Sequence, residues 1–303
     1  KIDGLDVSFT LLKSVRLFAK MKPGQIGENV TRVEDKSGFI KGFGTQEFRF
    51  NINVQQIILP ECSGNSQFVI EGNTSLTTVI LPKISYASFL NCSALSYADI
   101  RNATTIASFR GCPLNTLIAD KVTKLEGGDI FNNVNLNELN FPLLREVTGN
   151  ALRDCNISIF KAPNLEILGG IRNANTISEL YLPMLNTFTA GARGLEVDGL
   201  NYFYAPRCKS FGSNSVAEGV FDQGAVSGMV IVVNEFLKTS NGGAINANLA
   251  DAQSKGVTVI FASDVALPVE TIVQDKDGIN QFTSKNIRFE GFTFDAALDK
   301  IIA

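Results

Sequence analysis

Few types of side chain in this sequence could carry out acid–base or nucleophilic chemistry, because histidine is absent from all 303 residues. Its absence excludes Ser-His-Asp and Cys-His nucleophile systems, zinc sites with histidine ligands and histidine pH switches. What remains is a pair of carboxylates, a reactive lysine or a cation bound by carboxylates. A candidate pair is Glu138 and Glu179, with Lys161 between them in the sequence. The elements that position these side chains decide whether they meet.

The five cysteines follow no disulfide or metal-binding pattern. Their number is odd and their density is low for the chain length, which argues against a disulfide scaffold. Their spacing is too wide for a metal site, so we predict buried free cysteines, no metal ligands and no cofactor. Asp275 and Asp277 lie in a DKDG sequence, but the twelve-residue calcium loop with its terminal Glu is missing, which favours a turn.

Composition excludes several further classes of protein. The 27 basic and 30 acidic residues give a net charge of −3, without the basic field that nucleic-acid binding requires. Hydrophobic residues make up 45% of the chain, enough for one large core or two moderate ones. No apolar run reaches 18 residues, so we expect no transmembrane helix. The first residue, Lys1, fits a processed or truncated product.

An internal repeat organises the middle of the chain. Eight seven-residue segments align without gaps, and their ends are separated by 22, 19, 19, 22, 21, 20 and 23 residues. The segments are VQQIILP (54–60), LTTVILP (76–82), LSYADIR (95–101), LNTLIAD (114–120), LNELNFP (136–142), ISIFKAP (157–163), ISELYLP (177–183) and LNYFYAP (200–206).

The first, fourth and sixth positions of each segment are apolar. The alternation of the fourth and sixth positions places both side chains on one face of a short strand, and the Pro that often follows ends it. Five residues after the last position of most segments stands another apolar residue, namely Ala87, Ile106, Leu125, Val147, Leu168, Phe188 and Phe211. Four inward residues in one turn cannot enclose a core, so the turns must stack.

These positions resemble L-x-x-L-x-L, the strand signature of leucine-rich repeats. LTTVILPKI and ASFLNCSAL are similar to the BspA-like (treponemal-type) class of bacterial surface repeats. The resemblance covers about residues 54 to 233 and implies a bacterial cell-surface or secreted adhesion setting. It departs from the family pattern two residues after each segment, where Asn is usual and apolar residues stand instead: Cys62, Ile84, Ala103, Val122, Leu144, Leu165, Leu185 and Cys208.

The predicted fold is a β-rich solenoid of leucine-rich repeats, each of about 19–23 residues, with a stacked parallel sheet, an N-terminal cap and a C-terminal β-rich extension. We place the cap at residues 1–50, the solenoid at 51–263 and the tail at 264–303. Leu5, Phe9, Leu12, Val15 and Ala19 have helical spacing in the cap, and Phe48, Phe50 and Ile52 alternate as in a strand. Later elements are expected at 226–232 (strand), 248–255 (helix), 257–262 (strand) and 295–302 (helix).

The third and fifth positions of each segment lie between the inward ones and form an exposed strand face. Repeat proteins bind partners on such extended surfaces, and exposed tyrosines suit interfaces or stacking against sugars. Tyr and Thr are also ordinary strand residues, so this pattern alone does not require binding. The candidate binding residues are Tyr97, Glu138, Asn140, Lys161, Glu179, Tyr181, Tyr202 and Tyr204.

A catalytic role for Glu138 and Glu179 has weaker support than a binding role for the strand face. Two steps between neighbouring strands, each of about 4.8 Å, separate their backbones by about 9.5 Å. This is near the long end of the range of carboxyl separations in inverting glycosidases, about 6.5–9.5 Å. However, Lys161 between them would keep both carboxylates ionised. We therefore assign no catalytic residue and expect a non-enzyme.

The favoured hypothesis is a non-catalytic recognition module that binds a protein or glycan through the strand face. The resemblance places it outside the cell or on its surface. The alternative is a structural subunit of a larger assembly, such as a phage virion, that docks through residues 1–50 and 264–303. A carbohydrate-active enzyme is a third possibility.

Overall fold

The computed structural model describes residues 7–8, 32–35, 52–63, 68–132, 134, 136–174, 176–189, 195–197, 199–211 and 227–263, together with four short strands in the C-terminal region. The chain divides into two compact units, Lys1–Ser263 and Asp264–Ala303.

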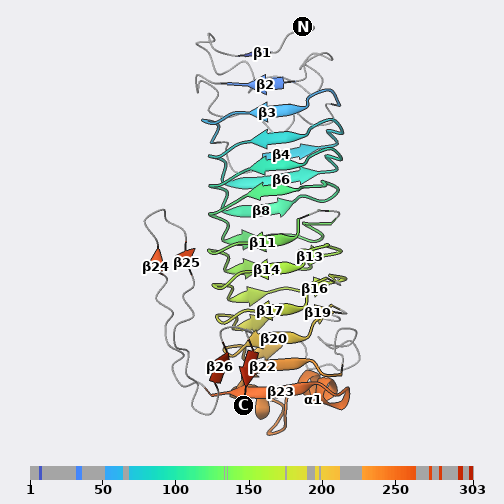
Figure 1. Cartoon of the computed structure of the whole chain (residues 1–303), viewed down its shortest axis with the longest axis vertical. Coiled ribbons are helices and arrows are strands. Elements are labelled where there is room, and N and C mark those ends of the chain that lie inside the picture. Colours follow the sequence, from blue (N-terminus) through green and yellow to red (C-terminus); the bar gives the residue numbers. More distant parts are fainter. Residues whose placement is uncertain are drawn as a thin grey trace. The chain divides into compact units, whose positions relative to one another are not determined.

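The first unit is a β-solenoid in which each turn adds short strands that pair in parallel with those of the neighbouring turns (Figure 1). One series of strands forms the first face. It comprises β1 (Val7–Ser8), β2 (Arg32–Glu34), β3 (Gln56–Ile58), β5 (Thr78–Ile80), β7 (Tyr97–Asp99), β9 (Thr116–Ile118), β11 (Glu138–Asn140), β14 (Ile159–Lys161), β17 (Glu179–Tyr181), β20 (Tyr202–Ala205), β22 (Val230–Asn234) and β23 (Thr258–Ala262). Every segment of the predicted repeat contributes one of these strands, which confirms the stacked solenoid.

The register within this face is the one that the repeat predicts. Equivalent positions of successive segments pair directly, as in Glu138 with Ile159 and Leu139 with Phe160. The face consists of three separately hydrogen-bonded sheets, β1-β2-β3-β5-β7-β9, β11-β14 and β17-β20-β22-β23.

A second, eight-stranded sheet lines the opposite part of each turn. Its strands are β4 (Phe68–Glu71), β6 (Tyr86–Leu90), β8 (Thr105–Ser108), β10 (Lys124–Leu125), β12 (Glu146–Val147), β15 (Ile167–Leu168), β18 (Thr187–Phe188) and β21 (Ser210–Phe211). A small third sheet contains β13 (Leu152–Arg153), β16 (Ile171–Arg172) and β19 (Leu195–Glu196). The apolar residues that follow most segments by five positions all lie in the second sheet and are buried.

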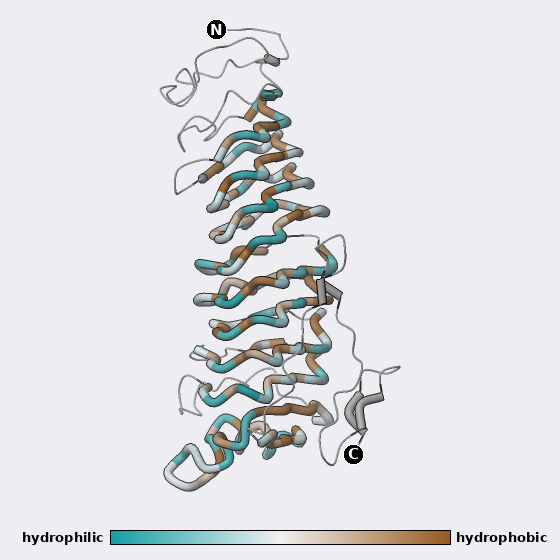
Figure 2. The backbone as a smooth tube through the Cα atoms, turned by 90° about the vertical axis from the view of Figure 1, so that its left-hand side faces the viewer, coloured by the Kyte–Doolittle hydropathy of each residue, from teal (hydrophilic) through white to brown (hydrophobic). Residues whose placement is uncertain are grey.

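The core runs along the axis as columns of equivalent apolar side chains. Hydrophobic and hydrophilic residues alternate along the turns as a consequence (Figure 2). The apolar positions that replace the usual Asn are buried, among them Cys62, Leu144 and Cys208. All five cysteines are free and buried, as predicted. Burial raises the pKa of the Cys155 and Cys208 thiols to about 12.

Large aromatic side chains fill one part of the core. Phe109 stacks on Phe89 at a centroid distance of 5.1 Å and on Phe131 at 6.2 Å, and Phe131 stacks on Phe141 at 6.1 Å. The rings come from four successive turns, so aromatic packing adds to the hydrogen bonds between rungs.

The corner that precedes the next first-face strand requires a left-handed backbone. Gly72, Asn91, Gly111, Asp154 and Asn173 occupy this position in different turns, with φ between 52° and 71°. Glycine, Asn and Asp adopt this conformation with the least steric cost. At Gly111 the approach is also close, because a Cβ there would lie 2.9 Å from the Asn91 Oδ1 and 3.3 Å from its Cα.

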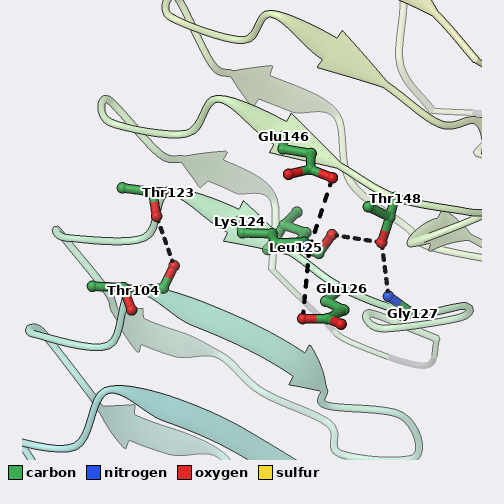
Figure 3. Close-up of polar contacts among 8 residues, drawn as sticks. All are labelled: Thr104, Thr123, Lys124, Leu125, Glu126, Gly127, Glu146 and Thr148. Atoms are coloured by element: carbon green, nitrogen blue, oxygen red, sulfur yellow. Dashed lines mark hydrogen bonds and ion pairs between the residues drawn. The ribbon is translucent and has the colours of Figure 1, made fainter.

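The outer surface of the second sheet is held by contacts between neighbouring turns (Figure 3). The Thr123 hydroxyl donates to the Thr104 carbonyl at 3.2 Å. The Thr148 hydroxyl donates to the Leu125 carbonyl at 3.3 Å. Lys124 lies between two carboxylates, 3.8 Å from Glu126 and 3.7 Å from Glu146. The polar side chains of Thr123, Lys124 and Thr148 therefore have partners within the solenoid.

The last turns of the first unit contain the two helices that the structure describes there. The 3-10 helix η3 (Glu235–Lys238) follows β22, and α1 (Ala247–Ser254) precedes β23. The Asn246 side chain caps α1 by accepting from the Asn248 amide at 3.0 Å, and Gly256 follows with a φ of 86°. The predicted helix and the strands on either side of it are thus confirmed.

Two other sequence predictions are wrong or incomplete. Val7–Ser8 form a strand inside the stretch whose spacing predicted a helix, because they pair in parallel with Val33 and Glu34 of the next turn. The rest of that predicted helix, as well as Phe48 and Phe50, lies outside the described residues. Ile52 lies in a bend before β3 and is 57% exposed.

In the second unit the structure describes two antiparallel strand pairs. β24 (Val273–Gln274) pairs with β25 (Asn280–Gln281), and β26 (Thr293–Asp295) pairs with β27 (Lys300–Ile302). The second pair shows that the helix predicted at 295–302 is wrong, since Phe294 lies opposite Ile301 and Asp295 opposite Lys300. The predicted DKDG turn at 275–278 lies outside the described residues. None of the helices that the structure describes is long and apolar enough to cross a membrane.

The aromatic column yields a test of core packing. Replacing Phe109 by Ala should lower the free energy of unfolding by about 3–5 kcal/mol, because the cavity would lie between two stacked rings. The matched control is Phe236→Ala in η3, where the ring is 56% exposed and the loss should stay below about 0.5 kcal/mol. Urea unfolding followed by circular dichroism measures both. Equal losses would contradict the assigned packing.

Candidate binding surface

The strand face is the set of outward side chains at the third and fifth positions of the first-face strands. Its character changes along the solenoid. On the early strands Gln56, Thr78 and Tyr97 are half-buried. Asp99, whose position predicted exposure, is only 4% exposed and pairs with the Arg101 guanidinium at 2.5 Å and 3.0 Å. This part of the face offers little exposed surface.

The middle of the strand face is exposed. Glu138 and Asn140 on β11, Ile159 and Lys161 on β14, and Glu179 on β17 all face solvent. We call these five residues the central patch. The Lys161 Nζ lies 2.8 Å from the Glu138 Oε1, so a charge pair joins two strands beside the apolar Ile159. The structure therefore brings together four of the predicted binding residues and adds Ile159.

The three tyrosines expected at the centre of the site form a stack. The Tyr181 and Tyr204 rings lie 4.7 Å apart and nearly parallel, at 4°, and the Tyr202 ring lies 6.2 Å from Tyr204. Tyr204 is only 2% exposed, which corrects the expectation that this ring is open to solvent. Tyr181 and Tyr202 are half-buried. The stack thus forms a largely covered margin of the central patch.

The Tyr202 hydroxyl is an unusual group in this margin. It is buried and has no hydrogen-bond partner among the described residues. Burial raises the pKa of Tyr202, and the neighbouring Tyr181 and Glu179 raise it further. A buried hydroxyl without a partner is destabilising.

Ile159 is not among the predicted site residues, which are all tyrosines or polar and charged residues. Its side chain is 39% exposed, one of the few large apolar side chains at the surface of the described residues. Its outward position in the repeat was the available signal, because an aliphatic residue at an exposed strand position lacks a packing role. Tyr97 lies on β7, four strands before the tyrosine stack, and does not join the central patch.

The geometry gives no support to a carboxylate pair. Lys161 neutralises Glu138 through the 2.8 Å contact, and it stands on the strand between Glu138 and Glu179. Within the described part of the chain, no group of three or more His, Cys, Asp or Glu side chains is arranged to hold a metal ion.

Comparisons with known proteins add little. No protein-family model matches the chain. No curated protein matches it. Among solved structures, the chain is similar to a leucine-rich repeat protein from Bacteroides ovatus, with 10% identity and a TM-score of 0.25 over 77% of this chain and 84% of that one. At that score the fold description rests on the strand pairing itself.

The unpartnered Tyr202 hydroxyl yields a prediction. Tyr202→Phe should raise the free energy of unfolding at pH 7 by about 1 kcal/mol, because it removes a buried polar group that makes no bond. The variant should also lose less stability above pH 10. In the wild type the unfolded phenol ionises near its ordinary pKa of 10.0 while the folded one stays protonated, so stability falls as pH rises.

Urea unfolding at pH 7 and between pH 9 and pH 11 measures both effects. Tyr97→Phe is the matched control, because Tyr97 is half-buried on the same face and its hydroxyl is absent from the buried atoms that lack a partner. A Tyr202→Phe variant that is less stable than the wild type at pH 7 would show that the hydroxyl has a partner.

Proposed function

We propose that this chain is a non-catalytic protein-binding module whose contact surface is the central patch. The observation that carries the proposal is exposure. Every residue of the patch is exposed, whereas among the outward side chains of β3, β5, β7 and β9 only Thr116 is exposed, and Tyr204 and Val232 after the patch are 2% and 3% exposed. A rigid parallel sheet holds the patch in place, since Glu138–Asn140 pair with Ile159–Lys161 along their length.

The chemistry of the central patch favours a protein as partner. An exposed aliphatic side chain lies among two carboxylates, an amide and an ammonium group, a combination that fits the mixed polar and apolar surfaces of proteins. A glycan was expected to stack on exposed tyrosines, but Tyr204 is buried in its stack. The proposal therefore commits to a protein partner.

The proposed location, outside the cell or on its surface, is supported by the sequence alone. The BspA-like resemblance of segments such as LTTVILPKI supports an adhesion role outside the cell or on its surface. The alternative, a subunit of an assembly such as a virion that docks through residues 1–50 and 264–303, predicts that deletion of 264–303 abolishes binding while patch variants retain it. An enzyme acting on polysaccharides would show turnover that Glu138→Gln abolishes.

Two isoleucines provide a matched test of the central patch. Ile159 on β14 and Ile167 on β15 are 39% and 38% exposed but lie on different sheets. Ile159→Asp should weaken binding of the partner by about tenfold or more, because it places a charge at the centre of the contact. Ile167→Asp should leave the affinity unchanged.

The measurement begins with capture of partners by the immobilised chain from a surface and secreted fraction of the native source, with identification by mass spectrometry. Dissociation constants for the purified partner then compare the wild type and both variants. Equal affinities of the wild type and Ile159→Asp would contradict the proposal.

A further inference from the structure

The first face is interrupted between β9 and β11, although the second sheet continues past this level through β8, β10 and β12. On the N-terminal side, the Thr116 amide donates to the Ser96 carbonyl at 3.1 Å, and the Ile118 carbonyl accepts from the Ile100 amide at 2.8 Å. No ladder joins β9 to β11 among the hydrogen bonds of the described residues. Figure 1 shows the same place as a wide step above β11.

The direction of these bonds identifies the backbone groups that border the interruption. Because Thr116 and Ile118 use their backbone groups toward β7, those of Leu117 point toward β11. On β11, the Asn137 carbonyl accepts from Ile159 and the Phe141 amide donates to Lys161. The amides and carbonyls of Glu138 and Asn140 therefore point toward β9. Two strand edges face each other across the interruption.

The core beneath the interruption is less well covered than elsewhere. Leu117 is partly exposed, whereas the leucines at the same repeat position in β11 and β17, Leu139 and Leu180, are buried. The other break in this face, between β14 and β17, lies between the buried Phe160 and Leu180. Among the described residues, only the first break combines two unpaired strand edges with a partly exposed inward residue, Leu117.

We propose that this interruption binds an extended segment of a partner protein, which inserts as a strand parallel to β9 and β11. An inserted strand would satisfy both edges at once. Its outward residues would pair with the backbone of Leu117, and its inward residue would pair with the backbone of Glu138 and Asn140. Addition of a strand to an open edge is an established mode of peptide binding in which main-chain bonds supply affinity and side chains supply specificity.

The side chains that border the interruption define the sequence of the inserted segment. The inward residue would lie between Leu117 and Leu139, so it must be aliphatic. The outward residue before it would lie between Thr116 and Glu138. Glu138 is the only charged side chain among the four outward residues that border the interruption, the other three being Thr116, Ile118 and Asn140. The Glu138 carboxylate also pairs with Lys161 at 2.8 Å, so a basic residue of the segment would share this carboxylate with Lys161. A basic residue followed by an aliphatic one is the complementary pattern.

This inference rests on the proposed protein-binding function for the class of ligand. Its contact shares Glu138 and Asn140 of β11 with the central patch, but it uses the edge of β11 that faces β9 and does not involve β14 or β17. The central patch binds through side chains, whereas the interruption binds through backbone edges. The variant Glu179→Lys separates them, because it alters the central patch and leaves β9 and β11 unchanged.

The test uses the full chain and a defined probe, an acetylated and amidated octapeptide with Lys-Val-Thr at its centre between Ser and Thr residues. Hydrogen exchange by NMR follows the amides of Leu117, Glu138 and Asn140. In the free protein they should exchange much faster than the paired amides of Thr116 and Ile159. At a peptide concentration about ten times Kd, their exchange should slow about tenfold.

Two control peptides and two variants test the mode of binding. N-methylation of the peptide's central Val should abolish binding, because that amide donates to the Glu138 carbonyl in the proposed complex. A peptide with Glu in place of Lys should bind the wild type more weakly. It should bind Glu138→Lys more tightly than the Lys peptide does, while Glu179→Lys should behave as the wild type.

Three results would overturn the proposal. The first is slow exchange of the Leu117, Glu138 and Asn140 amides in the free chain, which would mean that β9 and β11 pair in solution. The second is binding of the N-methylated peptide as tight as that of the parent. The third is loss of peptide binding in Glu179→Lys, which would place the peptide on the central patch.

Discussion

The structure depends on the hydrogen bonds that each turn makes with the next. A first-face strand of three residues cannot satisfy its backbone groups within its own turn, so its amides and carbonyls must bond to the turns above and below. The pattern is regular: the amides of Ser96 and Tyr97 share the Thr77 carbonyl, and those of Asn115 and Thr116 share the Ser96 carbonyl. Where one step of this ladder is missing, as beside Leu117, both the backbone and the core beneath it become accessible.

The packing of the core and the hydrogen bonds between strands require nearly the same distance between successive turns. Parallel strands lie about 4.8 Å apart, and the stacked rings of Phe89 and Phe109 lie at 5.1 Å. Flat rings of equivalent residues can therefore stack from turn to turn without distorting the ladder. Tyr181 and Tyr204 do the same on the outside of the first face at 4.7 Å. A column of aromatic residues is thus compatible with the solenoid on either side of the sheet.

Much of the fold could be predicted from the sequence, because a repeat reports the same environment many times. The apolar sixth positions of the segments recur in register, and those occupied by Leu59, Leu81 and Leu182 are buried. The prediction failed where no repeat supports it. Residues 295–302 carry apolar side chains whose spacing suits a helix as well as a strand pair, and only the pairing of Phe294 with Ile301 distinguishes the two.

The sequence by itself determined which side chains point inward and which point outward, since that depends on alternation along a strand. It did not determine which outward side chains are exposed. Asp99 is buried beside Arg101, Tyr204 is buried in a ring stack, and Ile159 is open to solvent, although all three hold outward positions. The tertiary structure decided these differences and also placed the interruption between β9 and β11. Exposure and strand pairing depend on neighbours that are brought close by the stacking of the turns, and a single segment carries no record of them.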